Sequence, residues 1–314
     1  MRAPRVSVVI PTHNRGHLLP ETLASALGQG PADLDLEVIV VDDGSTDGTA
    51  EMMAKRVAAI RDPRLVYLPL PRSGNLARLR NAGVARAQGA LIAFLDSDDL
   101  LEEGALATYA AALDAHPEAG WTLAGYRSFD AAGFRRTNLH PLPPELLENA
   151  ALEPVSGSLT VAPLFFPVLR TWTTLYTSTI AVRRPLLDAV GPFEERLTTG
   201  EYDLFTRLAF NAPAAVLHQP LVRIRKHPGN SSPGYGVEGF EDAIHGLTRF
   251  YAQGAVPRPL YDEMFLLYRY RLGRFLLGRG ERRAARRQFL ACLRLQPSHR
   301  PAWGGLAAAL VAGR

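Results

Sequence analysis

Three carboxylates within four residues follow one short apolar segment of the chain. Asp96, Asp98 and Asp99 come directly after Ala90–Leu95, a run that is typical of a buried strand. Like charges this close repel one another unless a cation lies among them. Carboxylate oxygens suit Mg²⁺ or Mn²⁺, and diphosphate oxygens would complete an octahedron. A helix N-cap explains only one of the three carboxylates, so we predict a divalent-metal site here.

Two further polar clusters also follow strand-like segments. Pro11–Arg15 ends an apolar run that begins at Val6, and Asp42–Asp47 follows Leu36–Val41. A carboxylate at a strand end can accept a hydrogen bond from a uracil imide or from ribose hydroxyls, and the amides of the Gly-Ser-Thr turn add donors. A plain turn with a helix cap is the alternative for this second cluster.

A third candidate is a single arginine in a helical segment. Arg80 lies on the predicted helix Asn75–Ala87, which begins after Gly74. A guanidinium at this place could bind two phosphate oxygens at once. An ordinary surface arginine is the alternative if the segment is considered alone.

The segments that connect these clusters alternate between short apolar strands and amphipathic helices. This alternation predicts a parallel sheet with helices on both faces, and in such sheets ligands bind beyond the carboxyl ends of the strands. The predicted strands are Val6–Pro11, Leu36–Val41, Leu65–Leu68 and Ala90–Leu95, and the predicted helices are His17–Leu27, Thr46–Ile60 (capped by Ser45 or Thr46) and Asn75–Ala87.

The second half of the chain is less regular. It is predicted to contain helices at Glu102–Ala115 and Tyr202–Phe210, an irregular stretch to about Pro167, strands at Thr173–Val182 and Ala214–Arg225, and only helices after Gly239. The last part, Tyr270–Leu310, is interpreted as two antiparallel helices that break around Gln296–Arg300 and resemble one tetratricopeptide hairpin.

The composition is that of an ordinary globular protein. The chain has 314 residues, 47% of them hydrophobic, and a formal net charge of +4, which excludes extensive disorder. The single cysteine, Cys292, excludes a disulfide framework and fits a reducing compartment. We expect no membrane-spanning helix and no signal peptide, and therefore a cytoplasmic protein.

The positive charge is concentrated in the last part of the chain. Residues 258–314 contain twelve arginines and three acidic residues, a net charge of +9, so residues 1–257 carry −5. Such a tail could contact the inner face of an anionic membrane or a partner protein, and a solvated helix face is the alternative. It lacks the interleaved aromatic residues of a single-strand binder, so we expect no nucleic acid partner.

In their order and spacing, the four clusters resemble glycosyltransferase family 2. The resemblance rests on Val6–Arg15, Val40–Asp47, Arg80–Gly83 and Phe94–Asp99. It implies a GT-A fold, which is a Rossmann-like α/β fold. It also implies an inverting enzyme that uses a divalent metal and a nucleoside-diphosphate sugar, with a role in cell-envelope polysaccharide biosynthesis.

The same resemblance implies a role for each matching residue. Thr12, Asp42 and Asp43 would hold the nucleoside, Arg80 would lie near the nucleotide or the donor sugar, and Asp96 would contact ribose or metal. Asp98 would bind the metal as part of an Asp-x-Asp element. The other residues expected on the donor side are Pro11, Asn14, Arg15 and Ser97.

The catalytic base is expected just before a Tyr-Asp-Leu helix start. Inversion needs a base on the face of the sugar opposite the leaving diphosphate. Alignment on Tyr202–Leu204 places Glu201 at the base position and Gly200 where the family often has glutamate. Asp203 is the second candidate, and the alternative for both is that they only complement a helix N-terminus.

One later segment, Arg223–Ser232, resembles the part of the family that closes over the diphosphate. Here His227 could bind metal or phosphate, and Arg225 or Lys226 could balance the charge of the leaving group. A turn histidine is the alternative for His227.

The predicted function is therefore a metal-dependent inverting glycosyltransferase that moves a sugar from a UDP- or GDP-linked donor to a saccharide or a lipid-linked acceptor. The predicted domains are a GT-A domain at residues 1–235 (nucleotide-binding half 1–100, acceptor half 101–235) and a helical extension at 236–314. Two alternatives remain: a metal-dependent nucleotidyltransferase, and a non-catalytic module that binds a sugar nucleotide or a partner.

Overall fold

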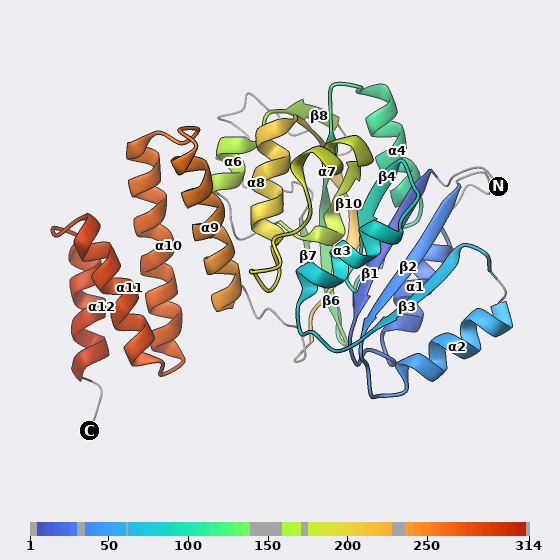
Figure 1. The fold of residues 1–314 in the computed structure, drawn as a ribbon, viewed down its shortest axis with the longest axis horizontal. Helices are drawn as coiled ribbons and strands as arrows, with labels where there is room; N and C mark the ends of the chain where they lie inside the picture. Colours follow the sequence, from blue (N-terminus) through green and yellow to red (C-terminus); the bar gives the residue numbers. More distant parts are fainter. Residues whose placement is uncertain are drawn as a thin grey trace. The chain divides into compact units, whose positions relative to one another are not determined.

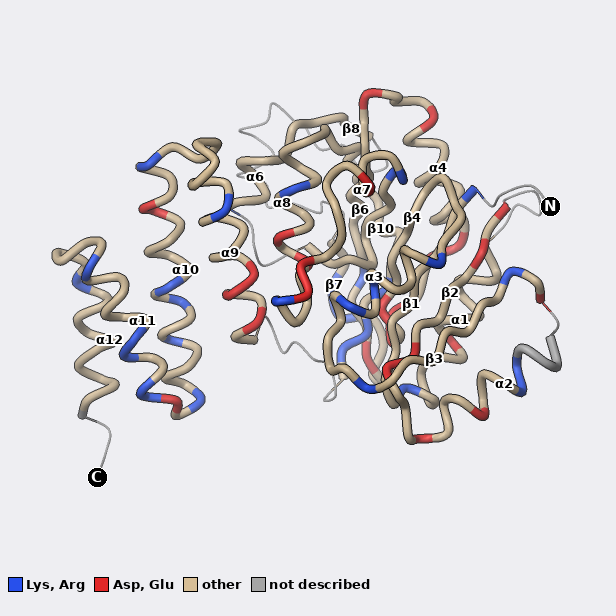
Figure 2. The backbone as a smooth tube through the Cα atoms, in the orientation of Figure 1, with Lys and Arg blue, Asp and Glu red and all other residues tan. Residues whose placement is uncertain are grey.

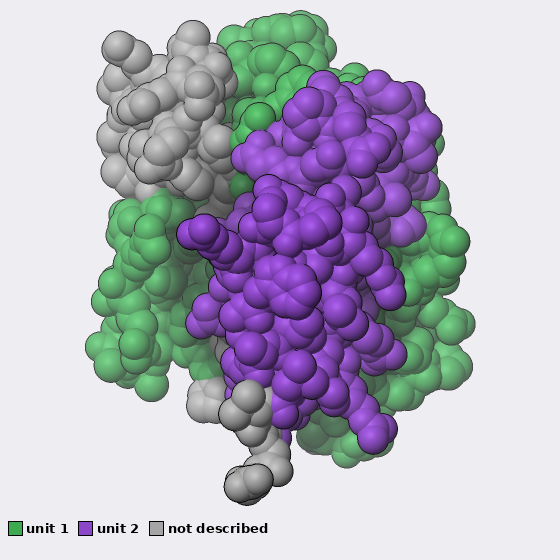
Figure 3. Space-filling view, turned by 90° about the vertical axis from the view of Figure 1, so that its left-hand side faces the viewer, with its two compact units in different colours: residues 1–230 green, residues 231–314 purple. Residues whose placement is uncertain are grey.

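The structure is a computed structural model that describes residues 5–29, 35–60, 62–138, 159–170, 175–227 and 236–311. The chain divides into two compact units, residues 1–230 and 231–314, which Figure 3 shows in different colours. The first unit is a mixed α/β structure and the second contains only helices among its described residues (Figure 1).

Four parallel strands form the first half of the sheet in the order β3-β2-β1-β4. Every residue of β1 (Val6–Thr12) and β2 (Leu36–Asp43) is buried. Two helices cover opposite faces, since Val8 and Ile10 belong to one core cluster with Leu19 of α1, whereas Val9 faces Gly83 of α3. The other elements of this half are α1 (Leu19–Leu27), α2 (Thr49–Ile60), β3 (Leu65–Leu70), α3 (Leu76–Arg86) and β4 (Leu91–Phe94).

The second half of the sheet is mixed. β9 (Ala181–Arg183) runs antiparallel to both β4 and β6 (Trp121–Asp130), and β10 (Ala214–Arg225) runs parallel to β6. The carboxyl ends of β1, β2, β4, β6 and β10 therefore lie along one edge of the sheet. The remaining elements are β5 (Leu100–Leu101), α4 (Ala105–Ala115), β7 (Gly133–Asn138), β8 (Leu159–Ala162), α6 (Phe165–Arg170), η1 (Thr177–Thr179), α7 (Arg184–Val190) and α8 (Glu201–Asn211).

The predicted α/β fold with a helical extension is confirmed, but some element predictions are wrong. The predicted strand Thr173–Val182 is mostly not a strand. Thr177–Thr179 forms the 3₁₀ helix η1, in which the amide and hydroxyl of Thr179 both donate to the carbonyl of Tyr176. These local bonds replace a strand ladder. Thr173 and Thr174 lie outside the described residues.

Two further corrections concern a helix start and missed strands. α2 begins at Thr49, whose amide donates to Asp47, so neither Ser45 nor Thr46 caps it. The stretch predicted to be irregular contains β6, β7 and β8. The sequence did not indicate β6 because Gly125 and Arg127 interrupt its apolar pattern.

The second unit consists of α9 (Val237–Ala252), α10 (Arg258–Gly278), α11 (Arg282–Leu295) and α12 (Arg300–Val311). Tyr270–Leu310 therefore contains the end of α10, all of α11 and all but the last residue of α12, because α10 ends at Gly278 and Gly280 adopts a φ of +79°. Phe289 lies between Gly273 of α10 and Gly305 of α12, which lets the three helices approach closely. The likeness to a tetratricopeptide hairpin stays a prediction.

Basic residues are distributed along α10 and α11 (Figure 2). Within the part of the chain that the structure describes, every helix is too short or too polar to cross a bilayer.

The close packing of α3 against the sheet predicts a destabilising substitution. A Cβ at position 83 would lie 2.3 Å from Cγ1 of Val9, so Gly83→Ala creates a clash that outweighs its gain in helix propensity of about 1 kcal/mol. We expect a net loss of about 2 kcal/mol in the free energy of unfolding, measured by urea titration. Arg78→Ala, at an exposed position of the same helix, is the control and should change it by less than about 0.5 kcal/mol. Equal effects of the two variants would contradict this packing.

Candidate active site

A fully buried arginine joins four segments at the carboxyl edge of the sheet. The Nη2 atom of Arg80 donates to Oδ1 of Asp96 at 3.0 Å and to Oε1 of Glu201 at 2.7 Å. It also donates to the hydroxyl of Thr177 at 3.0 Å, and Nη1 reaches the carbonyl of Thr199 at 3.4 Å. Thus α3, the turn after β4, η1 and the start of α8 all depend on one guanidinium.

The two carboxylates that share Arg80 have raised pKa values. For Glu201, burial raises the pKa most, the nearby Asp96 raises it further, and Arg80 only partly offsets them. For Asp96, burial again dominates, with Arg80 opposing and Asp98 adding repulsion. The side chain of Asp96 remains 35% exposed and that of Glu201 24% exposed, so a ligand can reach both.

This arrangement adds a role for Arg80 that its residue type did not indicate. The sequence suggested bidentate contact with phosphate oxygens, whereas Nη2 is occupied by carboxylates and Nε has no hydrogen-bond partner. Contact with the donor stays a prediction.

The acidic turn separates its three carboxylates. Asp99 accepts from the hydroxyl of Ser178 at 2.8 Å and from the amide of Arg225 at 3.0 Å, and it is buried. Burial, together with the charges of Asp98 and Asp96, raises the pKa of Asp99 well above its ordinary value. Asp99 therefore anchors the turn to η1 and β10 instead of facing a ligand.

Asp98 is the carboxylate that fits a metal site. Its Oδ2 lies 3.0 Å from Nε2 of His227, and Nη2 of Arg15 lies 3.7 Å away. Within the described ranges, no group of three or more acidic, histidine or cysteine side chains has metal-binding geometry. One carboxylate and one imidazole still fit Mg²⁺ or Mn²⁺, which commonly take only one or two protein ligands and complete their shell with substrate phosphates and water. The residues present therefore fit the predicted cation.

At the end of β2, both aspartates are engaged by the protein itself. Asp42 accepts from the amide and hydroxyl of Ser45 and from the hydroxyl of Tyr67 at 2.5 Å. Asp43 accepts from Arg72 and from the amides of Ser73 and Gly74. Both carboxylates thus hold the shape of the loops around them.

The hydrogen bonds to Asp43 decide its charge. Burial alone would raise the pKa of this carboxyl, but the bonds from Ser73, Gly74 and Arg72 together hold it below its ordinary value. Asp43 is therefore a carboxylate throughout the neutral range.

The loop after β1 is tied to the loop after β2. Asn14 adopts a φ of +51°, its amide donates to the hydroxyl of Ser45, and its side-chain oxygen accepts from the amide of Thr46 at 2.7 Å. Pro11 lies inside β1 opposite Val41. The buried hydroxyl of Thr12 has no hydrogen-bond partner, so it is the atom of this loop that a ligand could satisfy.

Arg225 and Ser97 lie next to the acidic turn. Nε of Arg225 donates to the carbonyl of Asp98 at 2.9 Å, Nη2 contacts Glu21 at 2.5 Å, and the guanidinium lies 4.5 Å from the centroid of the Phe129 ring. Ser97 is buried, and its carbonyl accepts from Thr22. Residues 228–232 of the predicted closing segment lie outside the described residues.

The two candidate bases occupy different environments. Asp203 is fully buried and forms an ion pair with Arg207 at 2.8 Å, while Arg207 also donates to the carbonyls of Val190 and Gly191. Glu201 is the partly exposed carboxylate. This geometry favours Glu201 as the residue that faces a substrate.

Gly200 has a conformational reason to be glycine. It precedes α8 with a φ of +61°, and a Cβ there would lie 3.3 Å from the amide nitrogen of Glu194. The resemblance predicts glutamate at this position, and the left-handed backbone explains why the chain has glycine instead.

The sequence analysis missed several residues that position the site. Thr177 and Ser178 contact Arg80 and Asp99 from a segment predicted to be a strand, and Tyr67 and Arg72 hold the β2 aspartates. No local pattern distinguishes them, because each acts through a partner at least 25 residues away.

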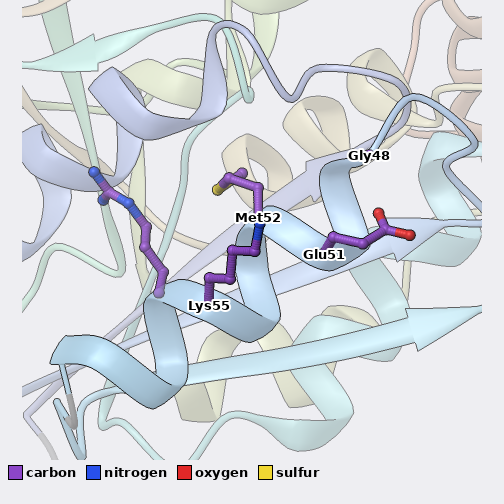
Figure 4. A pocket seen from close by; sticks show the side chains of 5 residues that line it. Gly48, Glu51, Met52 and Lys55 are labelled. Carbon is purple, nitrogen blue, oxygen red and sulfur yellow. The ribbon is translucent and has the colours of Figure 1, made fainter.

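A separate surface hollow lies on α2 and is shown in Figure 4. Its lining residues are Gly48, Glu51, Met52, Lys55 and Arg56. It contains none of the predicted site residues.

Comparison with known structures identifies the fold class. The chain aligns with Staphylococcus aureus TarS residues 1–349 in complex with UDP-GlcNAc, at a TM-score of 0.59 and 21% identity, over 97% of this chain and 90% of that one. It also aligns with the mannosyltransferase PcManGT of Pyrobaculum calidifontis in complex with GDP-Man and Mn²⁺, at a TM-score of 0.57 and 21% identity, over 100% of this chain and 77% of that one. The first unit therefore has the GT-A fold.

Comparison of sequences identifies the family. The model of glycosyl transferase family 2 matches residues 7–172, which is more than half of the chain, so the chain belongs to this family. It is 38% identical over 104 residues to the poly(ribitol-phosphate) beta-N-acetylglucosaminyltransferase TarP of Staphylococcus aureus, and 40% identical over 105 residues to the hyaluronan synthase of Pasteurella multocida. These matches span 32% and 33% of this chain, and only 31% and 10% of those proteins.

The bonds to Asp43 predict a pH-dependent stability. Because its pKa is lowered on folding, Asp43 stabilises the fold above its unfolded pKa, and this contribution is lost as the pH falls through the folded pKa. We expect Asp43→Asn to lower the free energy of unfolding by about 2 kcal/mol at pH 7, measured by urea titration.

The difference between wild type and Asp43→Asn should shrink as the pH approaches 3. Asp188→Asn, whose side chain is 62% exposed, serves as the control with little effect at either pH. A difference that stays constant between pH 7 and pH 3 would exclude this role of Asp43.

Proposed function

We propose that the protein is a metal-dependent inverting glycosyltransferase that transfers a sugar from a UDP- or GDP-linked donor to a saccharide or a lipid-linked acceptor. The observation that carries the proposal is that Asp98–His227 and Glu201–Arg80–Asp96 lie along the same edge of the sheet, joined by the turn 96–99. Family membership supports it, as do two structural neighbours, TarS in complex with UDP-GlcNAc and PcManGT in complex with GDP-Man and Mn²⁺. The reaction would take place in the cytoplasm, as a step of cell-envelope polysaccharide biosynthesis.

The proposed base is Glu201. Its carboxylate removes the proton from the acceptor hydroxyl while that oxygen attacks the anomeric carbon, and the bond to the donor diphosphate breaks on the opposite face. A pKa above the ordinary glutamate value makes this carboxylate a better proton acceptor near neutral pH. Arg80 orients it and keeps enough positive charge nearby for the ionised form to persist.

The proposed cation site uses Asp98 and His227, the two side chains that approach to 3.0 Å. A divalent cation bound there would neutralise negative charge on the departing nucleoside diphosphate. Arg15 and Arg225 add positive charge beside the same turn. Asp96 would contact the donor ribose or the metal. Thr12, with its unsatisfied hydroxyl, lies in the loop proposed to hold the nucleoside together with Asp42 and Asp43.

The two candidate bases are distinguished by one pair of variants. Glu201→Gln keeps the bond to Arg80 but cannot accept a proton, so we expect kcat to fall by about 10³-fold with UDP affinity retained. Asp203→Asn breaks a buried ion pair and should lower the melting temperature. Sugar transfer and thermal unfolding are measured on both variants, and an Asp203→Asn variant that folds normally but is inactive would reverse the assignment.

The acid side of the pH–rate profile provides a second check on Glu201. As the pH falls through its raised pKa, the carboxyl becomes protonated and can no longer act as a base. The wild-type rate should therefore decline at a pH above the ordinary glutamate pKa of 4.5.

Metal dependence is tested by substitution and by chelation. Asp98→Asn and His227→Ala should each lower transfer by about 100-fold, and excess chelator should abolish it in the wild type. His116→Ala, at a partly exposed histidine whose imidazole lies 3.2 Å from the exposed carboxylate of Glu118, is the matched control with unchanged activity. Full activity in chelator would end the metal proposal, and release of pyrophosphate instead of nucleoside diphosphate would identify a nucleotidyltransferase.

A further inference from the structure

Polar and basic side chains lie on one face of the sheet where β6, β7 and the end of β10 are neighbours. Tyr126 and Ser128 of β6 share this face, because residues two apart on a strand point the same way. On β7, Arg136 lies opposite Ser128, and beyond the end of β10, Lys226 continues the alternation of Val222 and Ile224, which pair with Tyr126 and Ser128. The register therefore places Tyr126, Arg136 and Lys226 on one face.

Tyr176 covers this face from the segment just before η1. Its ring meets that of Tyr126 edge-on at a centroid distance of 5.1 Å. The ammonium of Lys226 lies 5.1 Å from the Tyr176 ring centroid, and its Nζ donates to the Tyr176 hydroxyl at 3.4 Å. The two tyrosines and the lysine form one connected cluster.

The cluster lies beside the candidate base. Tyr176 directly precedes Thr177, whose hydroxyl accepts a hydrogen bond from Nη2 of Arg80 at 3.0 Å, and the same nitrogen donates to Glu201 at 2.7 Å. Burial raises the pKa of Tyr176 most, and the charges of Asp99 and Glu201 raise it further, in agreement with this proximity. The basic groups thus adjoin the place where an acceptor hydroxyl would meet its base.

The two cations are not neutralised by carboxylates among the described residues. The Lys226 ammonium contacts the ring and hydroxyl of Tyr176, and in the described part of the chain no carboxylate pairs with Lys226 or Arg136. The neighbouring Arg135, in contrast, is paired with Asp130, and Arg127 contacts Glu102. Uncompensated cations beside a reaction centre are suited to an anionic ligand.

We propose that Arg136, Lys226 and Tyr176 form an acceptor subsite for an anionic group, so that the acceptor carries a phosphate or a carboxylate close to its reacting hydroxyl. This proposal rests on the proposed function, because it assigns the acceptor side of the same centre. Arg136 and Lys226 bind the anionic oxygens, and the partly exposed ring of Tyr176 contacts the carbon skeleton beside them. The neutral saccharides that the sequence left open become poor acceptors.

Binding of three defined oligomers tests the subsite. The probes are a glycerol phosphate tetramer, tetragalacturonic acid and neutral maltotetraose, titrated calorimetrically into the full chain with UDP and Mn²⁺ present. We expect at least one anionic oligomer to bind about tenfold more tightly than maltotetraose, and the stronger of the two identifies phosphate or carboxylate as the group. Equal affinity for all three would overturn the proposal.

Substitutions locate the binding. Arg136→Gln and Lys226→Gln should each lower the affinity for the anionic oligomer by about tenfold, because each removes a charge-assisted hydrogen bond. Arg135→Gln changes the adjacent, carboxylate-paired arginine and is the matched control, with a change below about twofold. If Arg135→Gln loses as much affinity for the anionic oligomer as Arg136→Gln does, the effect comes from the overall charge of the surface, and the proposed subsite is overturned.

The donor is measured separately. Arg136→Gln should bind UDP as the wild type does, and a parallel loss of UDP affinity would place this cation at the donor diphosphate and overturn the proposal. Failure of the wild type to bind UDP or a UDP- or GDP-linked sugar would instead contradict the proposed function, and it is a different measurement from the oligomer titration.

Discussion

The site depends on one buried positive charge, the guanidinium of Arg80, which must be compensated by nearby carboxylates and hydrogen-bond acceptors. Arg80 has no access to solvent, and a buried guanidinium is tolerated only when carboxylates and hydrogen-bond acceptors surround it. Asp96, Glu201 and Thr177 provide these acceptors from three different elements, so the turn after β4, the start of α8 and η1 must converge on α3. The same contacts orient Glu201, the candidate base, and keep it close to the acidic turn. The same guanidinium thus meets a structural requirement and, under the proposed function, orients the base.

Most carboxylates at this edge hold loops in place, and few face outward. Asp42 and Asp43 receive hydrogen bonds from their own neighbourhood, and Asp99 is bound by Ser178 and the backbone of β10. Among the described residues, the Asp98–His227 pair, the hydroxyl of Thr12 and the partly exposed oxygens of Asp96 and Glu201 are the groups at this edge best placed for a ligand. An Asp-rich segment can thus be mainly architectural, with Asp98 as the proposed contact for the cation.

The family match and the geometry complement each other on the two sides of the centre. The matched region, residues 7–172, includes the loops after β1, β2 and β4, in which the proposed donor contacts lie. Glu201, Lys226 and His227 lie beyond it, and there the arrangement of side chains carries the argument. Gly200 illustrates this, because its left-handed backbone explains why a family-like carboxylate is absent at that position. Arg136 and Lys226, which no carboxylate of the described residues neutralises, are the basis for the proposed preference for an anionic acceptor.

The sequence by itself determined the parallel strands, the helices between them and the edge at which the polar clusters meet. Continuous apolar strands such as β1 and β2 are stable only when buried on both faces, and this pattern is local. The bounds of β10 could be predicted from its β-branched residues. The start of α8 could be predicted to within one residue from the polar residues that precede it. Only the tertiary structure decided that Arg80 binds carboxylates, that Asp203 is buried against Arg207, and that Thr177 and Ser178 belong to the site. These outcomes depend on partners that lie far away along the chain, or on which side of a helix meets solvent. A residue type at a given spacing does not encode either of these, because the strength of a charge interaction is set by burial and distance.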